Sequence, residues 1–180
     1  MISYPDHFTP SEKQFYGQAL QISNLPLLSL LSESEAIALS YYNYAFSTDI
    51  TVLFVDIGYC KTSFFAAHFQ DKHIKILKLV TLENFGVREI DEQIYQFLLE
   101  KLNKLNVGHD LKFKVRLLEQ IQKQRVVLSS IKEAQFHIEV NDNDFDFILD
   151  REQFNALIEK TGIDKKIQEL SKEFPSATQI

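Results

Sequence analysis

Three consecutive segments rich in β-branched and aromatic residues predict a β-meander in the first half of the chain. They are residues 50–56, 62–69 and 74–79, and this composition is typical of strands. The first segment is apolar on both faces, which favours a strand buried within a sheet. Residues 86–105 then carry apolar side chains at spacings of three and four, so they predict a long amphipathic helix after the meander.

The remainder of the chain predicts a helical region that contains one hairpin. Asp110 can cap a second amphipathic helix. Residues 135–140 and 145–149 flank a run of Asn and Asp residues, whose turn chemistry predicts a β-hairpin. Asp150 and Gln153 then form a capping box for a further helix, and a last short helix follows it.

Two capping boxes organise the first 48 residues. In a capping box, a hydroxyl and an acidic side chain three residues apart each accept from the other's backbone amide. This spacing is present in Thr9 with Glu12 and in Ser32 with Glu35. Each pair predicts a helix that begins directly after it. The apolar run at residues 25–31 lies between these helices and predicts a short buried strand.

The order of these elements predicts an α+β fold. A three-stranded meander whose first strand ends in a carboxylate, Asp56, and which is followed by a helix is how ribonuclease-H-like and actin-like ATPase lobes begin. Many other α+β domains share that order, so by itself it favours no single function. We expect three segments, at residues 1–48, 49–85 and 86–180.

Composition restricts the class of protein. Of the 180 residues, 45% are hydrophobic, which is enough for the core of about one domain. The net charge of −6 argues against nucleic acid or an anionic membrane as a partner. No apolar run is long enough to span a bilayer, and the N-terminus lacks the form of a signal peptide. The single cysteine, Cys60, fits a reducing compartment, so we expect a cytoplasmic location.

No metal site is expected from the residue spacing. The histidines are His7, His68, His73, His109 and His137, and none of them stands at metal-ligand spacing. The acidic run at residues 141–146 lacks the glycine and the distal glutamate of a calcium loop. We therefore interpret it as a turn.

A series of short segments, taken in order, resembles the heat-shock protein 70 family. The segments are P-D-H-F (5–8), N-L-P-L-L-S-L-L-S-E (24–33), A-I-A-L-S-Y (36–41), V-L-F-V-D-I-G (52–58), F-G-V-R-E-I-D (85–91) and L-S-S (128–130). Their order and spacing agree with the family from about residue 2 to residue 180. The loop after Asp56 lacks the family's triple glycine, and in that respect it is similar to the larger 110-kDa chaperones.

The resemblance implies a fold and a cofactor. Residues 1–48 would be the end of a first ATPase lobe, 49–85 the core meander of a second lobe, and 86–180 an inserted helical subdomain that bears the hairpin. Parent proteins of this family bind ATP or ADP with Mg²⁺, and they act with unfolded client proteins and with a partner chaperone of the heat-shock 70 type. Nothing in this chain corresponds to the family's first phosphate loop or catalytic lysine. We therefore expect the chain alone to bind no nucleotide and to be inactive.

Two acidic residues are candidate catalytic positions. Asp56 ends an apolar strand, where α/β folds present carboxylates to a ligand, and the resemblance implies that it positions the attacking water and the magnesium shell. Glu33 lies in the first turn of a helix, where exposed amides favour a carboxylate, and the resemblance implies that it orders water around the phosphates. Each has a simpler interpretation, since Asp56 could cap a turn and Glu33 could be an ordinary first-turn acid.

Six further residues match positions that contact nucleotide in the family. They are Gly58, Lys61, Gly86, Arg88, Arg125 and Ser129. Gly58 permits close approach of the backbone to a phosphate, whereas Tyr59 and Cys60 stand where the family has glycines. On the helix that would contact adenine, Gln122 and Val126 replace a glutamate and an arginine, which favours a packing surface over a nucleotide site.

These observations leave three functions to compare. The first is a piece of the nucleotide-binding domain of a divergent 70/110-type heat-shock chaperone, which assists folding or exchanges nucleotide on a partner chaperone. The alternative is a degenerate, non-catalytic actin-like interaction module without nucleotide binding. An unrelated ribonuclease-H-like enzyme comes last, because it needs several carboxylates around metal ions and only Asp56 ends a strand at the expected place.

Overall fold

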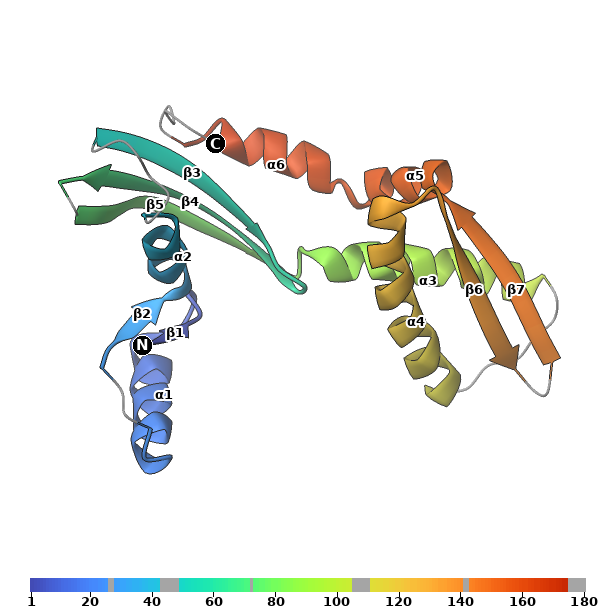
Figure 1. Ribbon diagram of the computed structural model, residues 1–180, viewed down its shortest axis with the longest axis horizontal. Helices are drawn as coiled ribbons and strands as arrows, with labels where there is room; N and C mark the ends of the chain where they lie inside the picture. The colour runs from blue at the N-terminus through green and yellow to red at the C-terminus, as the bar shows by residue number, and fades with distance from the viewer. Residues whose placement is uncertain (26–27, 43–48, 72, 105–110, 141–142, 175–180) are drawn as a thin grey trace. The chain divides into compact units, whose positions relative to one another are not determined.

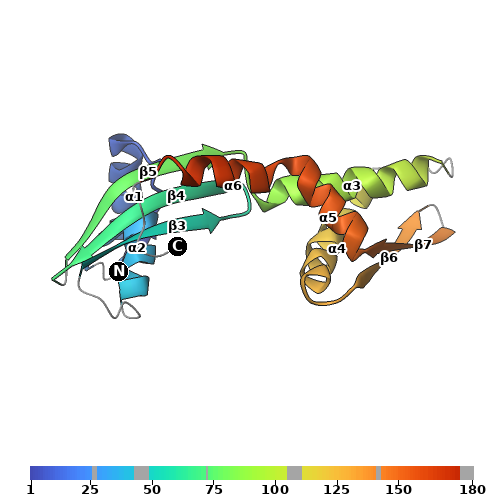
Figure 2. The same ribbon diagram turned by 90° about the horizontal axis from the view of Figure 1, so that it is seen from above.

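The computed structural model describes residues 1–25, 28–42, 49–71, 73–104, 111–140 and 143–174, and its elements are drawn in Figures 1 and 2. These residues form two compact units. The sheet unit contains residues 1–57, 62–83 and the described residues from 169 onward, and the helical unit contains residues 58–61 and 84–168. Within the described part of the chain, no helix combines the length and the apolarity needed to cross a membrane.

The predicted meander forms the centre of the sheet unit. Strands β3 (Asp49–Ile57), β4 (Lys61–Gln70) and β5 (His73–Glu83) are neighbours in that order. β3 pairs antiparallel with β4, and Asp49 lies opposite Gln70 at one end of the ladder. β4 is the central strand, and its residues 62–67 are buried without interruption. The prediction of three consecutive strands is confirmed.

Helix α2 (Glu33–Tyr42) covers one face of this sheet (Figures 1 and 2). Ala38 of α2 is fully buried in the same cluster as Phe65 of β4. The helix begins at the predicted capping box, in which the Ser32 backbone N–H donates to Glu35 Oε2 at 2.8 Å and the Glu35 N–H donates to Ser32 Oγ at 3.3 Å. Local capping therefore sets where α2 starts, and apolar burial sets what it packs against.

A two-stranded parallel sheet precedes these elements. β1 (Ile2–Tyr4) and β2 (Leu30–Ser32) pair with each other and are connected through α1 (Pro10–Ile22). α1 begins at the other predicted capping box, in which the Thr9 N–H donates to Glu12 Oε2 at 2.7 Å. The predicted helix start is confirmed.

The expectation of a buried strand over residues 25–31 is wrong. Only the end of that run enters a strand, because the pairing with β1 begins with Leu30 opposite Ile2. Leu25 and Leu28 are exposed instead, and residues 26 and 27 lie outside the described residues. An apolar run predicts burial only where a partner strand reaches it.

The last described residues group with the sheet unit. Phe174 stacks against Phe64 of β4 with ring centroids 6.4 Å apart, and the Lys78 Nζ of β5 donates to the Glu173 backbone carbonyl at 3.0 Å. This grouping differs from the expected segment 86–180, because burial of an aromatic ring against the sheet draws the chain end to it. The N-terminal segment likewise groups with the sheet, through α2. The assignment of the three segments to family lobes stays a prediction.

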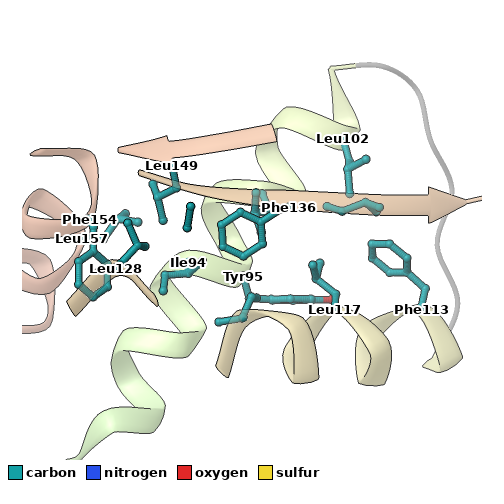
Figure 3. Packing of buried hydrophobic residues seen from close by; sticks show 14 of the residues in the cluster. Ile94, Tyr95, Leu102, Phe113, Leu117, Leu128, Phe136, Leu149, Phe154 and Leu157 are labelled. Carbon is teal, nitrogen blue, oxygen red and sulfur yellow. The ribbon is translucent and has the colours of Figure 1, made fainter. Parts of the chain in front are cut away.

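The helical unit is built around one apolar core. α3 (Val87–Asn103) and α4 (Leu111–Ser130) pack with the hairpin of β6 (Glu133–Val140) and β7 (Asn143–Asp150), and α5 (Arg151–Thr161) contributes to the same core. Figure 3 shows its central side chains, among them Ile94, Tyr95, Leu117, Phe136, Leu149 and Leu157. β6 alternates strictly between exposed and buried residues, so one face of the hairpin covers the helices and the other is exposed.

The ends of the later helices also follow local rules. The Gln153 N–H donates to Asp150 Oδ1 at 2.8 Å at the start of α5, which confirms the predicted capping box. Gly162 ends α5 with a φ of 71°, a left-handed conformation that favours glycine. α6 (Ile163–Ser171) follows it. The predicted cap at Asp110 lies outside the described residues.

An exposed contact between His137 and Asp146 on the outer face of the hairpin is expected to make the stability of the helical unit depend on pH. His137 Nδ1 lies 2.7 Å from Asp146 Oδ1, and this hydrogen bond and charge, with smaller contributions from Asp144 and Glu139, raise the pKa of His137 above its ordinary value of 6.5. The resulting stabilisation is fully present below pH 6.5 and is lost as the pH rises through the raised pKa. We expect His137→Gln to lower the urea midpoint at about pH 5.5 but not at about pH 8.5.

An NMR titration supplies the matched control for this prediction. Asp146→Asn keeps the imidazole and removes its main partner, so the pKa of His137 should fall toward its ordinary value. Equal titration of His137 in the wild-type and Asp146→Asn chains would contradict the assigned cause.

Candidate functional site

The loop between β3 and β4 is bound to the N-terminus of α3. The loop closes on itself, since the Gly58 N–H donates to the Lys61 carbonyl at 2.9 Å. The Val87 N–H donates to the Gly58 carbonyl at 3.0 Å, and the Arg88 N–H donates to the Tyr59 carbonyl at 2.8 Å. The first amides of a helix have no partner within it, so the loop carbonyls satisfy two amides of the kind that can bind anions at a helix N-terminus.

Gly86 allows this close approach. A Cβ at Gly86 would lie 2.5 Å from the Gly58 carbonyl oxygen and 2.7 Å from the Tyr59 carbonyl oxygen. Both atoms belong to the backbone, so neither could move aside without displacing the loop. The φ of Gly86 is −169°, an ordinary extended value. Glycine is therefore required at this position for space and not for conformational freedom.

The side chain of Tyr59 extends from the loop to α4. The Gln122 Nε2–H donates to the Tyr59 hydroxyl oxygen at 3.0 Å. Tyr59 remains 43% exposed, so its ring lies on the surface of the helical unit. One loop residue thus contacts α3 through its backbone and α4 through its side chain.

Asp91 of α3 and Arg125 of α4 form a buried ion pair beside this contact. The Arg125 Nε–H donates to Asp91 Oδ1 at 2.6 Å, and the Asp91 side chain has no exposed surface whereas that of Arg125 is 22% exposed. Burial raises the pKa of the Asp91 carboxyl, while Arg125 and the Tyr59 hydroxyl act in the opposite direction. Among the described residues, Asp91 Oδ2 makes no hydrogen bond of ordinary geometry, with Tyr59 or any other group.

Arg88 and Ser129, predicted to contact nucleotide, have partners close to them in sequence. The Arg88 Nη2 donates to Asn84 Oδ1 at 3.2 Å and lies 3.3 Å from Glu89 Oε1. The Ser129 hydroxyl donates to the Val126 carbonyl at 2.6 Å, within its own helix. Both side chains are exposed, and neither contacts the loop through a described hydrogen bond.

The two candidate catalytic residues belong to the sheet unit. Asp56 lies near the end of β3, opposite Ser63, and is half-buried. Glu33 is the first residue of α2. At that helix start the Ser34 N–H and hydroxyl both donate to Asp6, at 3.1 Å and 2.6 Å, so Asp6 satisfies an amide of the first turn. Sequence reasoning did not predict this role for Asp6.

The structure therefore brings the predicted residues together in two groups. Gly58, Lys61, Gly86, Arg88, Arg125 and Ser129 are in the helical unit, and Glu33 and Asp56 are in the sheet unit. Within the described part of the chain, no cluster of three or more His, Cys, Asp or Glu residues could hold a metal ion. The helical unit offers hydrogen-bond donors, among them the guanidinium groups of Arg88 and Arg125, which suit recognition of a polar ligand.

Sequence reasoning missed the Asp91 ion pair and the Tyr59 contact. A signal for the first was present, since Asp91 precedes Ile94, Tyr95 and Leu98 at spacings of three, four and seven. A carboxylate on an otherwise apolar helix stripe requires a buried partner. No local signal pairs Tyr59 with Gln122, which is 63 residues away.

Comparison with known proteins gives consistent matches. A family described as "Hsp70 protein" matches residues 1–178. The chain is 33% identical over 167 residues to heat shock 70 kDa protein 16 of Arabidopsis thaliana, covering 87% of this chain and 22% of that protein. It is 32% identical over 165 residues to heat shock protein 88 of Dictyostelium discoideum (87% and 21%). It is 26% identical over 170 residues to a heat shock protein homolog of Saccharomyces cerevisiae (87% and 24%). The chain thus spans about a fifth to a quarter of the length of these relatives.

Proposed function

This chain belongs to the heat-shock protein 70 family and is similar to its 110-kDa-class members, and on that premise we propose that it is part of the nucleotide-binding domain of a chaperone that assists folding or exchanges nucleotide on a partner chaperone. Family membership implies the actin-like ATPase fold, and ATP or ADP with Mg²⁺ in the parent protein. The α+β architecture of the chain is consistent with that fold. The further assignment of the helical unit as an inserted subdomain is part of the proposal.

One observation supports the proposal more than any other. The loop that resembles a phosphate loop, the turn at Gly86 and the helix that carries Arg125 and Ser129 are in one compact unit. The family resemblance assigns these same three elements to the nucleotide. These three elements are far apart in sequence and yet share one unit, which supports an origin in a nucleotide-binding domain.

The groups in the helical unit do not fit a bound nucleotide in this arrangement. The amides of Val87 and Arg88, which could bind phosphate, already donate to loop carbonyls. The Arg125 Nε is engaged by Asp91, and Val126, which is 62% exposed, has no guanidinium to stack on a base. We therefore assign no hydrolytic step to Asp56 or Glu33 in this chain, and we favour nucleotide exchange over ATP hydrolysis.

Two assays on the purified chain test this proposal. We expect no ATP turnover above background and no change in Asp56→Asn. We expect the chain to accelerate release of fluorescent ADP from a heat-shock 70 chaperone by on the order of tenfold, the range of ordinary coupling between binding sites. The matched control is release driven by unlabelled nucleotide alone. ATP turnover that disappears in Asp56→Asn would show instead that the chain is an enzyme.

The degenerate interaction module remains the second candidate, because the loop carbonyls and the Tyr59 hydroxyl already accept hydrogen bonds from within the chain. The same release assay separates the two. Binding to the partner chaperone without any change in ADP release would favour the interaction module. Accelerated release would favour the exchange role.

A further inference from the structure

Tyr59 contacts both α3 and α4. Its backbone carbonyl accepts from the Arg88 N–H at the start of α3, and its hydroxyl accepts from Gln122 on α4. The loop carbonyls thus occupy the amides to which an anion would bind. The Tyr59 hydroxyl likewise accepts from the Gln122 side-chain amide, a donor of the kind that suits a polar ring or a ribose.

The neighbouring donors are also engaged. The Val87 N–H donates to the Gly58 carbonyl, and the Arg125 Nε–H donates to Asp91. Gly86 permits this arrangement because a Cβ there would collide with the loop backbone. Tyr59 is 43% exposed, and its hydroxyl accepts from Gln122 and acts on the Asp91 carboxyl.

We propose that Tyr59 is a specificity-determining residue, which excludes nucleoside from the polar face of α4 by acting as a built-in substitute for it. The proposal rests on the proposed function, which assigns that face of α4 to the nucleotide. Tyr59 replaces a glycine of the resembled loop, and a glycine could not reach Gln122. Cys60, the adjacent replacement, is exposed, and of the two replaced residues Tyr59 is the one whose side chain contacts α4.

NMR titration of the isotope-labelled full chain with Mg-ADP, up to about 5 mM, tests the proposal. The variants are Tyr59→Gly, which removes the ring, and Tyr59→Phe, which removes only the hydroxyl. The matched control is Cys60→Gly, which adds the same backbone freedom one residue along. We expect saturable shifts at Gln122 and Ser129 in Tyr59→Gly, with an apparent Kd at least roughly tenfold lower than in the wild type and in Cys60→Gly.

Hydrogen exchange in the absence of ligand tests the contact between Tyr59 and Gln122 independently of nucleotide binding. The Gln122 side-chain amide should exchange with solvent faster in Tyr59→Phe than in the wild type, by roughly two- to tenfold, because a neutral hydrogen bond is lost. The backbone amides of Val87 and Arg88 should remain protected in that variant, since their acceptors are carbonyls. This pattern also shows that the variant is folded.

Each remaining outcome overturns a defined part of the inference. Unchanged Gln122 exchange in Tyr59→Phe would overturn the contact and leave the proposed function intact. Faster exchange without ADP binding in Tyr59→Gly would show that α4 is not a nucleoside surface, which overturns the nucleotide assignment and the exclusion together. An equal gain of binding in Cys60→Gly would show that loop freedom, and not the Tyr59 ring, controls access.

Discussion

Replacing Arg125 with methionine is expected to destabilise the helical unit by about 3 kcal/mol at neutral pH. The change keeps much of the side-chain volume and leaves the Asp91 carboxylate buried without its cation. Removing one partner of a buried ion pair costs about 3–5 kcal/mol, and the 22% exposure of Arg125 places the expected loss at the lower end. Urea unfolding, with hydrogen exchange of the α3 amides as the local readout, measures it.

The pH dependence identifies the cause of this loss. Burial raises the pKa of Asp91, and without Arg125 the pKa should rise further. A raised carboxyl pKa contributes stability that is fully present below the ordinary value of 3.8 and is lost as the pH rises through the folded-state pKa. The deficit of Arg125→Met should therefore shrink as the pH is lowered from about 7 toward 4.

A double variant serves as the control. Asp91→Leu together with Arg125→Met removes both charges and should recover most of the lost stability, because apolar replacement of a buried pair is often neutral or stabilising. Two results would contradict the ion-pair account: a deficit in Arg125→Met that does not change with pH, or a double variant less stable than either single one.

The second large effect is expected from Gly86→Ala. The added Cβ would lie 2.5 Å from one backbone oxygen and 2.7 Å from another, distances that real side chains do not show. Either the loop leaves α3 or the helix shifts, and overpacking of this kind costs about 1–3 kcal/mol. The same urea experiment reports the stability, and faster hydrogen exchange of the Val87 and Arg88 amides would report loss of the loop contact.

Gly17→Ala is the matched control for this change. Gly17 lies inside α1, and a Cβ there would meet only Leu30 Cδ1, at 3.8 Å, an ordinary contact. Alanine is favoured over glycine in a helix interior by about 1 kcal/mol, so this variant should be slightly more stable than the wild type. Equal behaviour of the two variants would show that crowding at Gly86 has no consequence.

These variants also bear on function, because they separate the loop contact from the rest of the unit. Gly86→Ala should release the loop from α3 and leave Asp91 paired with Arg125. Arg125→Met should break that ion pair and leave the loop bound to α3. If the exchange role depends on the loop conformation, only Gly86→Ala should lower the acceleration of ADP release.

The amino-acid sequence alone determined which elements form and where several of them begin. Capping boxes at Thr9, Ser32 and Asp150 start helices at the predicted residues, because a cap and its partner lie three residues apart. The strand order β3–β4–β5 and the hairpin also follow from patterns confined to a few neighbouring residues. The family was identified correctly for the same reason, since the resemblance rests on short segments, and the family match covers residues 1–178.

Only the tertiary structure decided which of these elements bury each other and which polar groups meet. Leu25 and Leu28 are as apolar as any core residue, yet both are exposed, and the described pairing with β1 begins only at Leu30. The Asp91–Arg125 pair spans 34 residues, and the contact between Tyr59 and Gln122 spans 63. Such contacts depend on how whole helices and loops pack, because side chains so far apart in sequence meet only once their elements are in place. The candidate site of this protein consists of these long-range contacts.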